Sequence, residues 1–255
     1  MRKKTILSTM LLLAILPAAV RGATLIESRS GDGAVNRIWI DGGRMRVDVG
    51  GAPGYMLVDT DAGRMYSVNP LERAVVDLTP SPAPGGRAPR PAVEVVFEEK
   101  GDGPRIAGYA TTRYVVTAKG ETCSVEYLSR EAMNEIGAYE VLRKVDQLST
   151  AGLDETEMAD MDPCTLAMLD VDRHYAEKGF PVRIEDVGGN LRTELVRIDR
   201  KATVPPPGFE IPAEYRSLDP ETMGEEEPAP PAAPEEDEEL QRMIEQLRRE
   251  TPPQK

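Results

Sequence analysis

Polar and apolar residues alternate through several short segments of residues 37–78, and residues typical of turns separate these segments. The clearest segment is Arg-Met-Arg-Val-Asp-Val at 44–49, whose period of two predicts a strand with one face in solvent and one face covered. Asp-Gly-Gly at 41–43 and Asp-Ala-Gly at 61–63 supply the backbone conformations that tight turns need. Because links this short can join only antiparallel neighbours, the sequence predicts a meander of about five strands. Its apolar face must pack against helices or against another part of a curved sheet.

The same alternation recurs outside the meander and predicts further strands of the same domain. We expect them at 24–30, 93–98, 113–117, 123–128, 181–187 and 191–198. The segment 79–91 contains five prolines and two glycines, which excludes a central strand, and we interpret it as a loop within the domain. Residues 204–215 are extended and rich in proline, so they belong at a sheet edge or on the surface.

The periodicity changes from two to about 3.6 at Ser129, which predicts a helical insertion at 129–179. Ser129 suits the N-cap of a first helix, and Gly137 is an expected weak point near its first turns. A second helix should begin at Asp162, followed by proline at the first helical position, and end at Gly179. The apolar face of the first helix is expected to consist of Ala138, Leu142, Val145 and Leu148.

The N-terminal residues have the pattern of a secretory signal peptide. Three basic residues at 2–4 precede an apolar run at 6–20, and a membrane-spanning helix needs about 20 apolar residues. We therefore expect residues 1–23 to be a signal peptide that is cleaved near 19–23. The mature protein is expected to be soluble, not membrane-spanning, and exported, most simply to a bacterial periplasm.

The C-terminal residues 221–255 differ in composition from the body at 24–220, which we interpret as one domain. They contain 11 acidic and four basic residues, many prolines and no aromatic residue, which is typical of disorder. Residues 240–247 carry an apolar stripe at helical spacing, formed by Leu240, Met243, Ile244 and Leu247. A helix of about 10 residues is marginal alone, so this segment is either a docking helix for an envelope protein partner or a fraying tail.

The net charge limits the classes of partner that the protein can bind, and the cysteine content indicates the compartment in which it folds. The net charge of −13 argues against nucleic acid as a partner. The two cysteines, Cys123 and Cys164, favour a disulfide in a chain that is exported to an oxidising compartment. Cys123 begins a predicted strand and Cys164 lies in the first turn of the second predicted helix, so this disulfide would join helix to sheet. The alternative is a pair of buried thiols.

Residue patterns typical of catalysis are scarce. His174 is the only histidine, and the sequence has neither the His-x-x-x-His nor the Cys-x-x-Cys spacing of metal sites. Neither cysteine has the context of a nucleophile. Met158, Met161 and Met168 have thioethers that suit Cu(I), but methionine more commonly fills cores. We expect no catalytic residue, no metal and no cofactor, although abundant carboxylates leave a hydrolase open as a third hypothesis.

Three sequence patterns resemble the exported families related to LolA and LolB, the outer-membrane lipoprotein carriers. The first is Arg-Met-Arg-Val-Asp at 44–48 with Gly-Arg-Met-Tyr-Ser-Val-Asn-Pro at 63–70. The second is the Gly-Tyr and later Tyr pattern of 106–114, and the third is the Phe, Pro, Tyr pattern of 209–215. The resemblance is to uncharacterised families with this fold. It implies a mainly β (α+β) domain, a strongly curved antiparallel sheet or half-barrel of about 11 strands with two helices packed on its concave face.

Several predicted strands carry apolar residues on both faces, which is typical of a sheet whose concave side holds a ligand. The alternative is that the helices and C-terminal segments cover these residues. The residues expected to line a ligand site are Trp39, Met45, Val47, Leu57, Met65, Tyr66, Val95, Phe97, Tyr114, Val116, Leu166 and Leu169.

Two functions follow from these observations. The first is a non-enzymatic periplasmic protein that binds a lipid, a lipoprotein acyl chain or another hydrophobic ligand. The second is an envelope interaction module that contacts a protein partner, with its acidic tail at 221–255 and without a ligand cavity.

Overall fold

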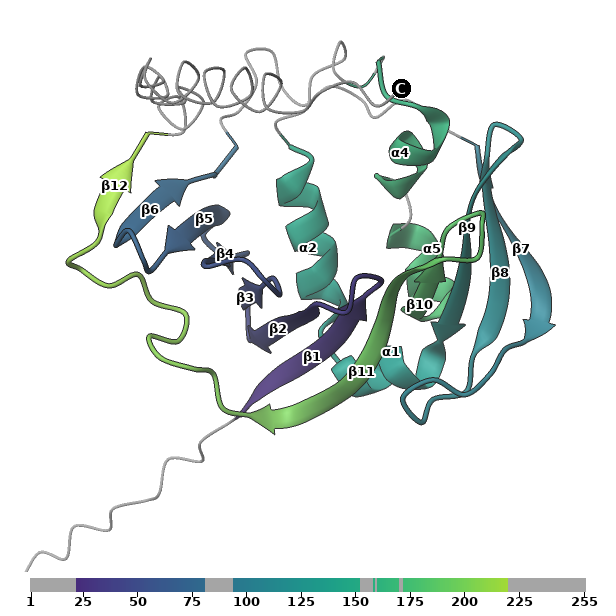
Figure 1. The fold of residues 1–255 in the computed structure, drawn as a ribbon, viewed down its shortest axis with the longest axis horizontal. Helices are drawn as coiled ribbons and strands as arrows, with labels where there is room; N and C mark the ends of the chain where they lie inside the picture. The colour runs from purple at the N-terminus through teal and green to yellow at the C-terminus, as the bar shows by residue number, and fades with distance from the viewer. Residues whose placement is uncertain (1–21, 81–93, 152–157, 159, 170–171, 220–255) are drawn as a thin grey trace, which may run out of the picture.

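The computed structural model describes residues 22–80, 94–151, 158, 160–169 and 172–219. The predicted signal peptide up to residue 21, the proline-rich loop from 81 to 91 and the tail from 220 onward lie outside the described residues. The described residues form one open, strongly curved sheet of 12 strands (Figure 1). The mainly β class and the curved sheet predicted from the sequence are thus confirmed.

The strands, in chain order, are β1 (Ala23–Ser30), β2 (Val35–Asp41), β3 (Arg44–Asp48), β4 (Tyr55–Asp59), β5 (Arg64–Asn69), β6 (Ala74–Asp77), β7 (Val95–Asp102), β8 (Thr112–Ala118), β9 (Glu121–Ser129), β10 (Phe180–Glu185), β11 (Leu191–Ala202) and β12 (Arg216–Leu218). Their order across the sheet is β12-β6-β5-β4-β3-β2-β1-β11-β10-β9-β8-β7. The pairing of β1 with β11 joins two halves of the sheet, one formed by β1 to β6 with β12 and the other by β7 to β11.

The predicted meander is present as β2 to β6, each antiparallel to the next. Ile40 lies opposite Met45, Met45 opposite Val58, and Val58 opposite Met65. Directly opposed residues share a face of the sheet, so these four side chains form one row. All four are buried in the main core cluster. This row therefore lies on the apolar face that the alternation of polar and apolar residues predicts to be covered.

The last strand, β12, departs from the all-antiparallel sheet expected from the sequence. It pairs in parallel with β6 at one edge of the sheet. Parallel neighbours need a long connection, and β6 and β12 are far apart in the sequence. Strand β12 is brought back to this edge by the chain between β11 and β12. This segment, residues 203–215, passes over the face of the meander opposite the row of Ile40 and Met45 (Figure 1). This face of the meander is therefore covered by the segment 203–215.

Each of the two predicted helices is divided into two within the described residues. They are α1 (Arg130–Ile136), α2 (Tyr139–Ser149), α4 (Pro163–Met168) and α5 (Asp172–Lys178). Gly137 caps α1 in the left-handed conformation at φ 62°, so the first predicted helix is interrupted at the predicted weak point. As expected, the Ser129 hydroxyl accepts from the Ala132 amide, and Asp162 accepts from the first amides of α4.

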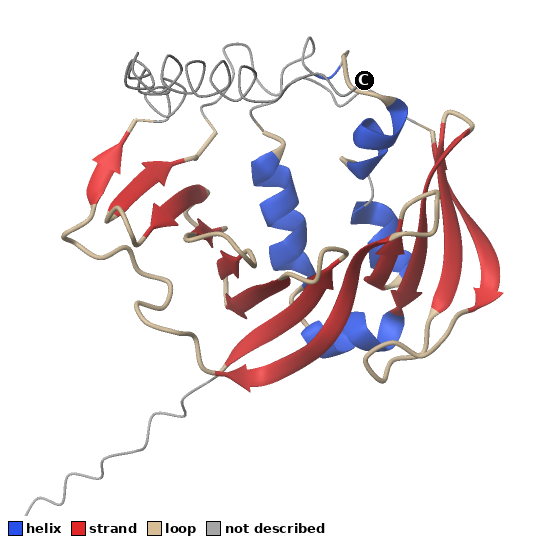
Figure 2. Ribbon diagram, viewed as in Figure 1, coloured by secondary structure: helices blue, strands red, loops and turns tan. Residues whose placement is uncertain are grey.

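The helices contact different parts of the sheet (Figure 2). Helix α1 packs on β10 and β11, α4 on β8 and β9, and α5 on β9 and β10. Helix α2 places Val141, Leu142, Val145 and Leu148 against the core cluster that contains the Met45 and Val58 row. No residue of α2 is fully buried, so this helix covers the meander only in part. Of the helices in the described part of the chain, none combines the length and hydrophobicity of a transmembrane segment.

Candidate ligand-binding groove

A row of side chains crosses five neighbouring strands beside the row that α2 covers. Val47 lies opposite Met56, Met56 opposite Ser67, Ser67 opposite Val76, and Val76 beside Leu218 of β12. Residues two apart on a strand point to the same face, so Val47 lies on the same face as Met45, and Met56 on the same face as Val58. The new row therefore continues the helix-covered face toward the sheet edge.

This row lines a groove of about 310 Å³. Val49 and Ala74 extend its apolar wall, and Val49 remains 48% exposed despite its apolar side chain. Glu72 is the charged residue among the described residues that line the groove. Helix α2 contributes no lining residue, and its Lys144 pairs with Asp61 in the turn between β4 and β5. The groove is thus an open, largely apolar surface on the helix side of the sheet.

The 12 predicted lining residues divide into three groups in the structure. Met45, Val47 and Met65 lie on the helix side of the meander, and Val47 lines the groove. Trp39, Leu57 and Tyr66 lie on the opposite face against the C-terminal segment 203–215. The remaining residues lie in the other half of the sheet or on α4, namely Val95, Phe97, Tyr114, Val116, Leu166 and Leu169. The sequence could not separate the first two groups, because a one-residue change of register exchanges the faces.

Arg46 holds the segment 203–215 on the outer face of the meander, which is the face opposite the helices. Its side chain is only 6% exposed, and Nη1 donates to the carbonyl oxygens of Pro205 at 2.9 Å and Gly208 at 3.3 Å. Nε and Nη2 donate to the two carboxylate oxygens of Asp48, at 2.7 and 3.1 Å. The guanidinium carbon lies 3.9 Å from the centre of the Tyr55 ring, a cation–π contact. Specific bonds therefore hold the segment 203–215 on the face of the meander opposite the helices.

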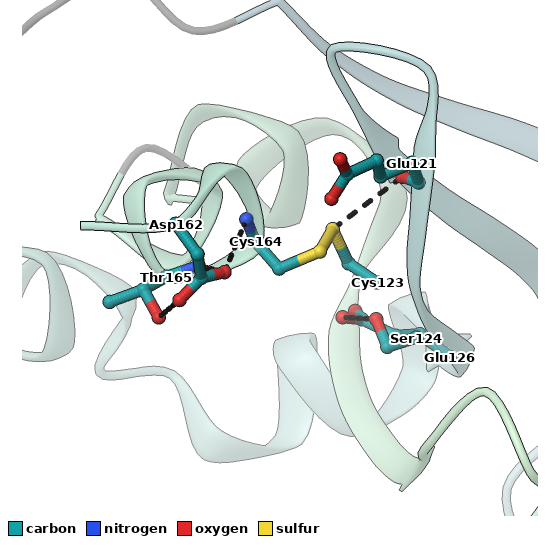
Figure 3. The surroundings of a disulfide bond; sticks show 7 residues. All are labelled: Glu121, Cys123, Ser124, Glu126, Asp162, Cys164 and Thr165. Atoms are coloured by element: carbon teal, nitrogen blue, oxygen red, sulfur yellow. Dashed lines mark hydrogen bonds between the residues drawn. A yellow bond between two sulfur atoms is a disulfide. The ribbon is translucent and has the colours of Figure 1, made fainter. Parts of the chain in front are cut away.

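A second cavity, of about 210 Å³, lies beside the disulfide in the other half of the sheet. Cys123 of β9 and Cys164 of α4 are joined with their Cα atoms 5.2 Å apart, which confirms the predicted disulfide (Figure 3). Ala167 and the exposed Met168 of α4 line the same cavity. The disulfide thus joins helix to sheet as expected, and it is consistent with folding in an oxidising compartment.

Glu126 of β9 is a buried carboxyl group at this second cavity. Its two oxygens accept from the hydroxyl groups of Ser124 at 2.9 Å and Tyr175 at 3.0 Å. Burial raises the pKa of Glu126, and the hydrogen bonds from Ser124 and Tyr175 counteract this only in part. The burial of Glu126 could not be predicted from the sequence, because an acidic residue in an alternating strand is expected on the solvent-exposed face.

Of the residues considered for catalysis or metal binding, His174, Met158 and Met161 have packing contacts. The His174 ring stacks on Phe97 with 4.6 Å between ring centres. Met158 and Met161 belong to the core cluster around the disulfide, whereas Met168 is 62% exposed. Across the described residues, the structure brings together no group of three or more His, Cys, Asp or Glu side chains that could hold a metal ion.

Comparisons with known proteins identify a family and a distant structural likeness. No curated protein matches the sequence. The crystal structure of MucB is similar with a TM-score of 0.34 and 12% sequence identity, over 76% of this chain. The matched part covers 59% of the MucB chain, less than two thirds of its length. The sequence profile described as a domain of unknown function (DUF4412) matches residues 44–215, which confirms the expected resemblance to an uncharacterised family. The chain therefore belongs to the DUF4412 family.

Proposed function

We propose that this protein is a non-enzymatic periplasmic protein that binds a lipid, an acyl chain or a similar hydrophobic ligand on the concave face of its sheet. The observation that carries the proposal is the apolar groove formed by the row from Val47 to Leu218. The groove continues the core-facing side of the sheet beyond the part that α2 covers. Val49 is 48% exposed and Val47, Met56 and Leu218 are partly exposed, so the groove offers an accessible apolar surface to a ligand.

The dimensions and chemistry of the groove favour a flexible chain over a compact polar ligand. Its volume of about 310 Å³ lies at the lower end of small-molecule sites. A row across five strands extends about 19 Å, since neighbouring strands are about 4.8 Å apart. Met56 adds a flexible, polarisable side chain in the middle of the row. These properties suit an extended acyl chain.

The rest of the chain supports an exported carrier rather than an enzyme. The helices lie inside the curve of the sheet in Figure 2, so that curve forms the concave face in our proposal. The disulfide and the signal-like residues 1–23 support the periplasm as the compartment. The Glu126 carboxyl is bonded to Ser124 and Tyr175, which favours a structural role for this acid.

Binding of the fluorescent apolar probe N-phenyl-1-naphthylamine tests the proposal. Met56→Glu places a charge in the middle of the groove, and we expect probe affinity to fall at least about tenfold, because burying an unpaired charge costs more than about 1.4 kcal/mol. Val187→Glu is the matched control, since Val187 is apolar and exposed in the distant β10–β11 turn. Equal probe binding by both variants would reject the groove as the site. No probe binding by the parent protein would favour an interaction module.

A further inference from the structure

We propose that the chain's own apolar stripe at Leu240, Met243, Ile244 and Leu247 docks in this groove and competes there with the hydrophobic ligand. The docking itself follows from the groove, the chain connectivity and the stripe. The competition rests on the proposed function. The protein would then regulate its own site, because a ligand must displace the tail before it can bind.

The position of the groove relative to the tail is the first observation. Leu218 of β12 forms one end of the groove, and the described chain ends one residue later, at Asp219. The tail therefore starts at the wall of the groove. The 20 residues at 220–239 separate this point from the stripe. Twenty residues span at most about 66 Å when fully extended, compared with about 19 Å for the groove. The connection is thus long enough for the stripe to reach the whole groove.

The chemistry of the stripe is the second observation. Its four apolar residues have the i, i+3, i+4, i+7 spacing of one helix face, within a segment that is otherwise mostly charged or polar. Such a helix covers about 10 Å along its axis, which fits within the groove. Because a helix this short is marginal in water, it gains its stability by laying its apolar face on a surface.

Charge at the sheet edge is the third observation. Arg73 and Arg216 are both exposed beside the groove, where the Arg216 amide donates to the Arg73 carbonyl. Arg216 also lies beside Ala74, which lines the groove. Neither guanidinium forms an ion pair with another residue in the described part of the chain. The acidic residues at 235–239 immediately precede the stripe, so docking brings opposite charges together.

Paramagnetic broadening in the full chain tests the docking without any ligand. A nitroxide is attached at Glu245→Cys, which lies away from the stripe on the same segment, after the native disulfide has formed. We expect the Met56 methyl signal in the groove to broaden, and the Met168 methyl signal in the other half of the sheet to stay sharp. Adding Ile244→Glu to the labelled chain should restore the Met56 signal.

Three results would overturn the inference. They are a sharp Met56 signal in the labelled chain, broadening that persists with Ile244→Glu, and broadening that arises only between labelled and unlabelled copies.

Probe binding to the same full-length variants separates this inference from the proposed function. If the docked state is populated about nine-tenths of the time, Ile244→Glu should bind N-phenyl-1-naphthylamine about tenfold more tightly than the parent. Broadening of Met56 with no probe binding in any variant rejects the proposed function and retains the docking. Unchanged probe affinity together with a sharp Met56 signal rejects the docking and retains the proposed function.

Discussion

Replacing Arg46 by Met tests whether this side chain holds the C-terminal segment 203–215 on the sheet. The methionine keeps an apolar stem between Trp39 and Tyr55 but removes the guanidinium. The carbonyl oxygens of Pro205 and Gly208 then lose their donor, at distances of 2.9 and 3.3 Å in the parent. Asp48, about one third exposed, loses its bidentate partner.

The expected loss of stability is about 3 kcal/mol. A hydrogen bond from a charged donor contributes about 1.5–3 kcal/mol, and the longer bond to Gly208 belongs at the low end of that range. The cation–π contact with Tyr55 adds about 1 kcal/mol. Breaking a buried ion pair costs about 3–5 kcal/mol, but the Asp48 side chain is 29% exposed, and its access to solvent reduces the cost.

Urea unfolding followed by Trp39 fluorescence measures this effect, because Trp39 is the only tryptophan and packs beneath the same segment. Arg64→Met is the matched control. Arg64 also pairs with an acid, Asp77, and lies over an aromatic ring, that of Tyr66, but its side chain is 48% exposed. We expect a loss below about 1 kcal/mol for the control. A loss no larger for Arg46→Met than for Arg64→Met would refute the anchoring role of Arg46.

Three further predictions concern the half of the sheet that carries the disulfide. Replacing Cys123 and Cys164 together by Ala should lower the free energy of unfolding by about 4 kcal/mol for a loop of this length, and a loss below about 1 kcal/mol in urea would contradict the role of the disulfide. Burial raises the pKa of Glu126, so the native state binds this proton more tightly than the unfolded state, and the resulting stabilisation at low pH is lost as pH rises through the folded-state pKa. Glu126→Gln should therefore gain stability relative to the parent as pH rises from about 4 to about 8, and a melting-temperature difference that is constant with pH would be the contrary result. Gly179→Ala should destabilise the protein in thermal melts, because φ is +121° and the added Cβ would lie 2.4 Å from the carbonyl carbon of Ser129, and an unchanged melting temperature would argue against this close approach.

Local patterns were sufficient to predict most elements of the fold. Alternation and turn residues placed the meander, and Ser129 and Asp162 marked helix starts that the structure confirms. Strand β12 was missed because it has three residues and exists through parallel pairing with β6, which leaves no periodic signal. Gly137 was predicted to be a weak point of the first helix. In the structure its left-handed conformation ends α1, so that α1 and α2 are separate helices.

The candidate site was harder to predict, because the sequence does not say which apolar face is covered. Leu57 and Met56 are adjacent on β4 and face opposite sides, and both are apolar. Leu57 packs near Ile211 of the C-terminal segment, so its burial depends on residues far away in the sequence. Met56 lines the groove, to which no helix in the described part of the chain contributes a residue. Leu57 and Met56 therefore differ in burial because a segment distant in the sequence covers only one face of the strand.

Native mass spectrometry of the protein, purified without detergent from the cells that produce it, tests the central claim most directly. The account predicts an adduct of lipid mass on the parent protein that organic extraction removes. It also predicts that Met56→Glu, purified in the same way, carries much less of this adduct, whereas Val187→Glu carries as much as the parent. A parent protein observed only at its bare polypeptide mass, or an adduct equally abundant on Met56→Glu, would contradict ligand binding in the groove.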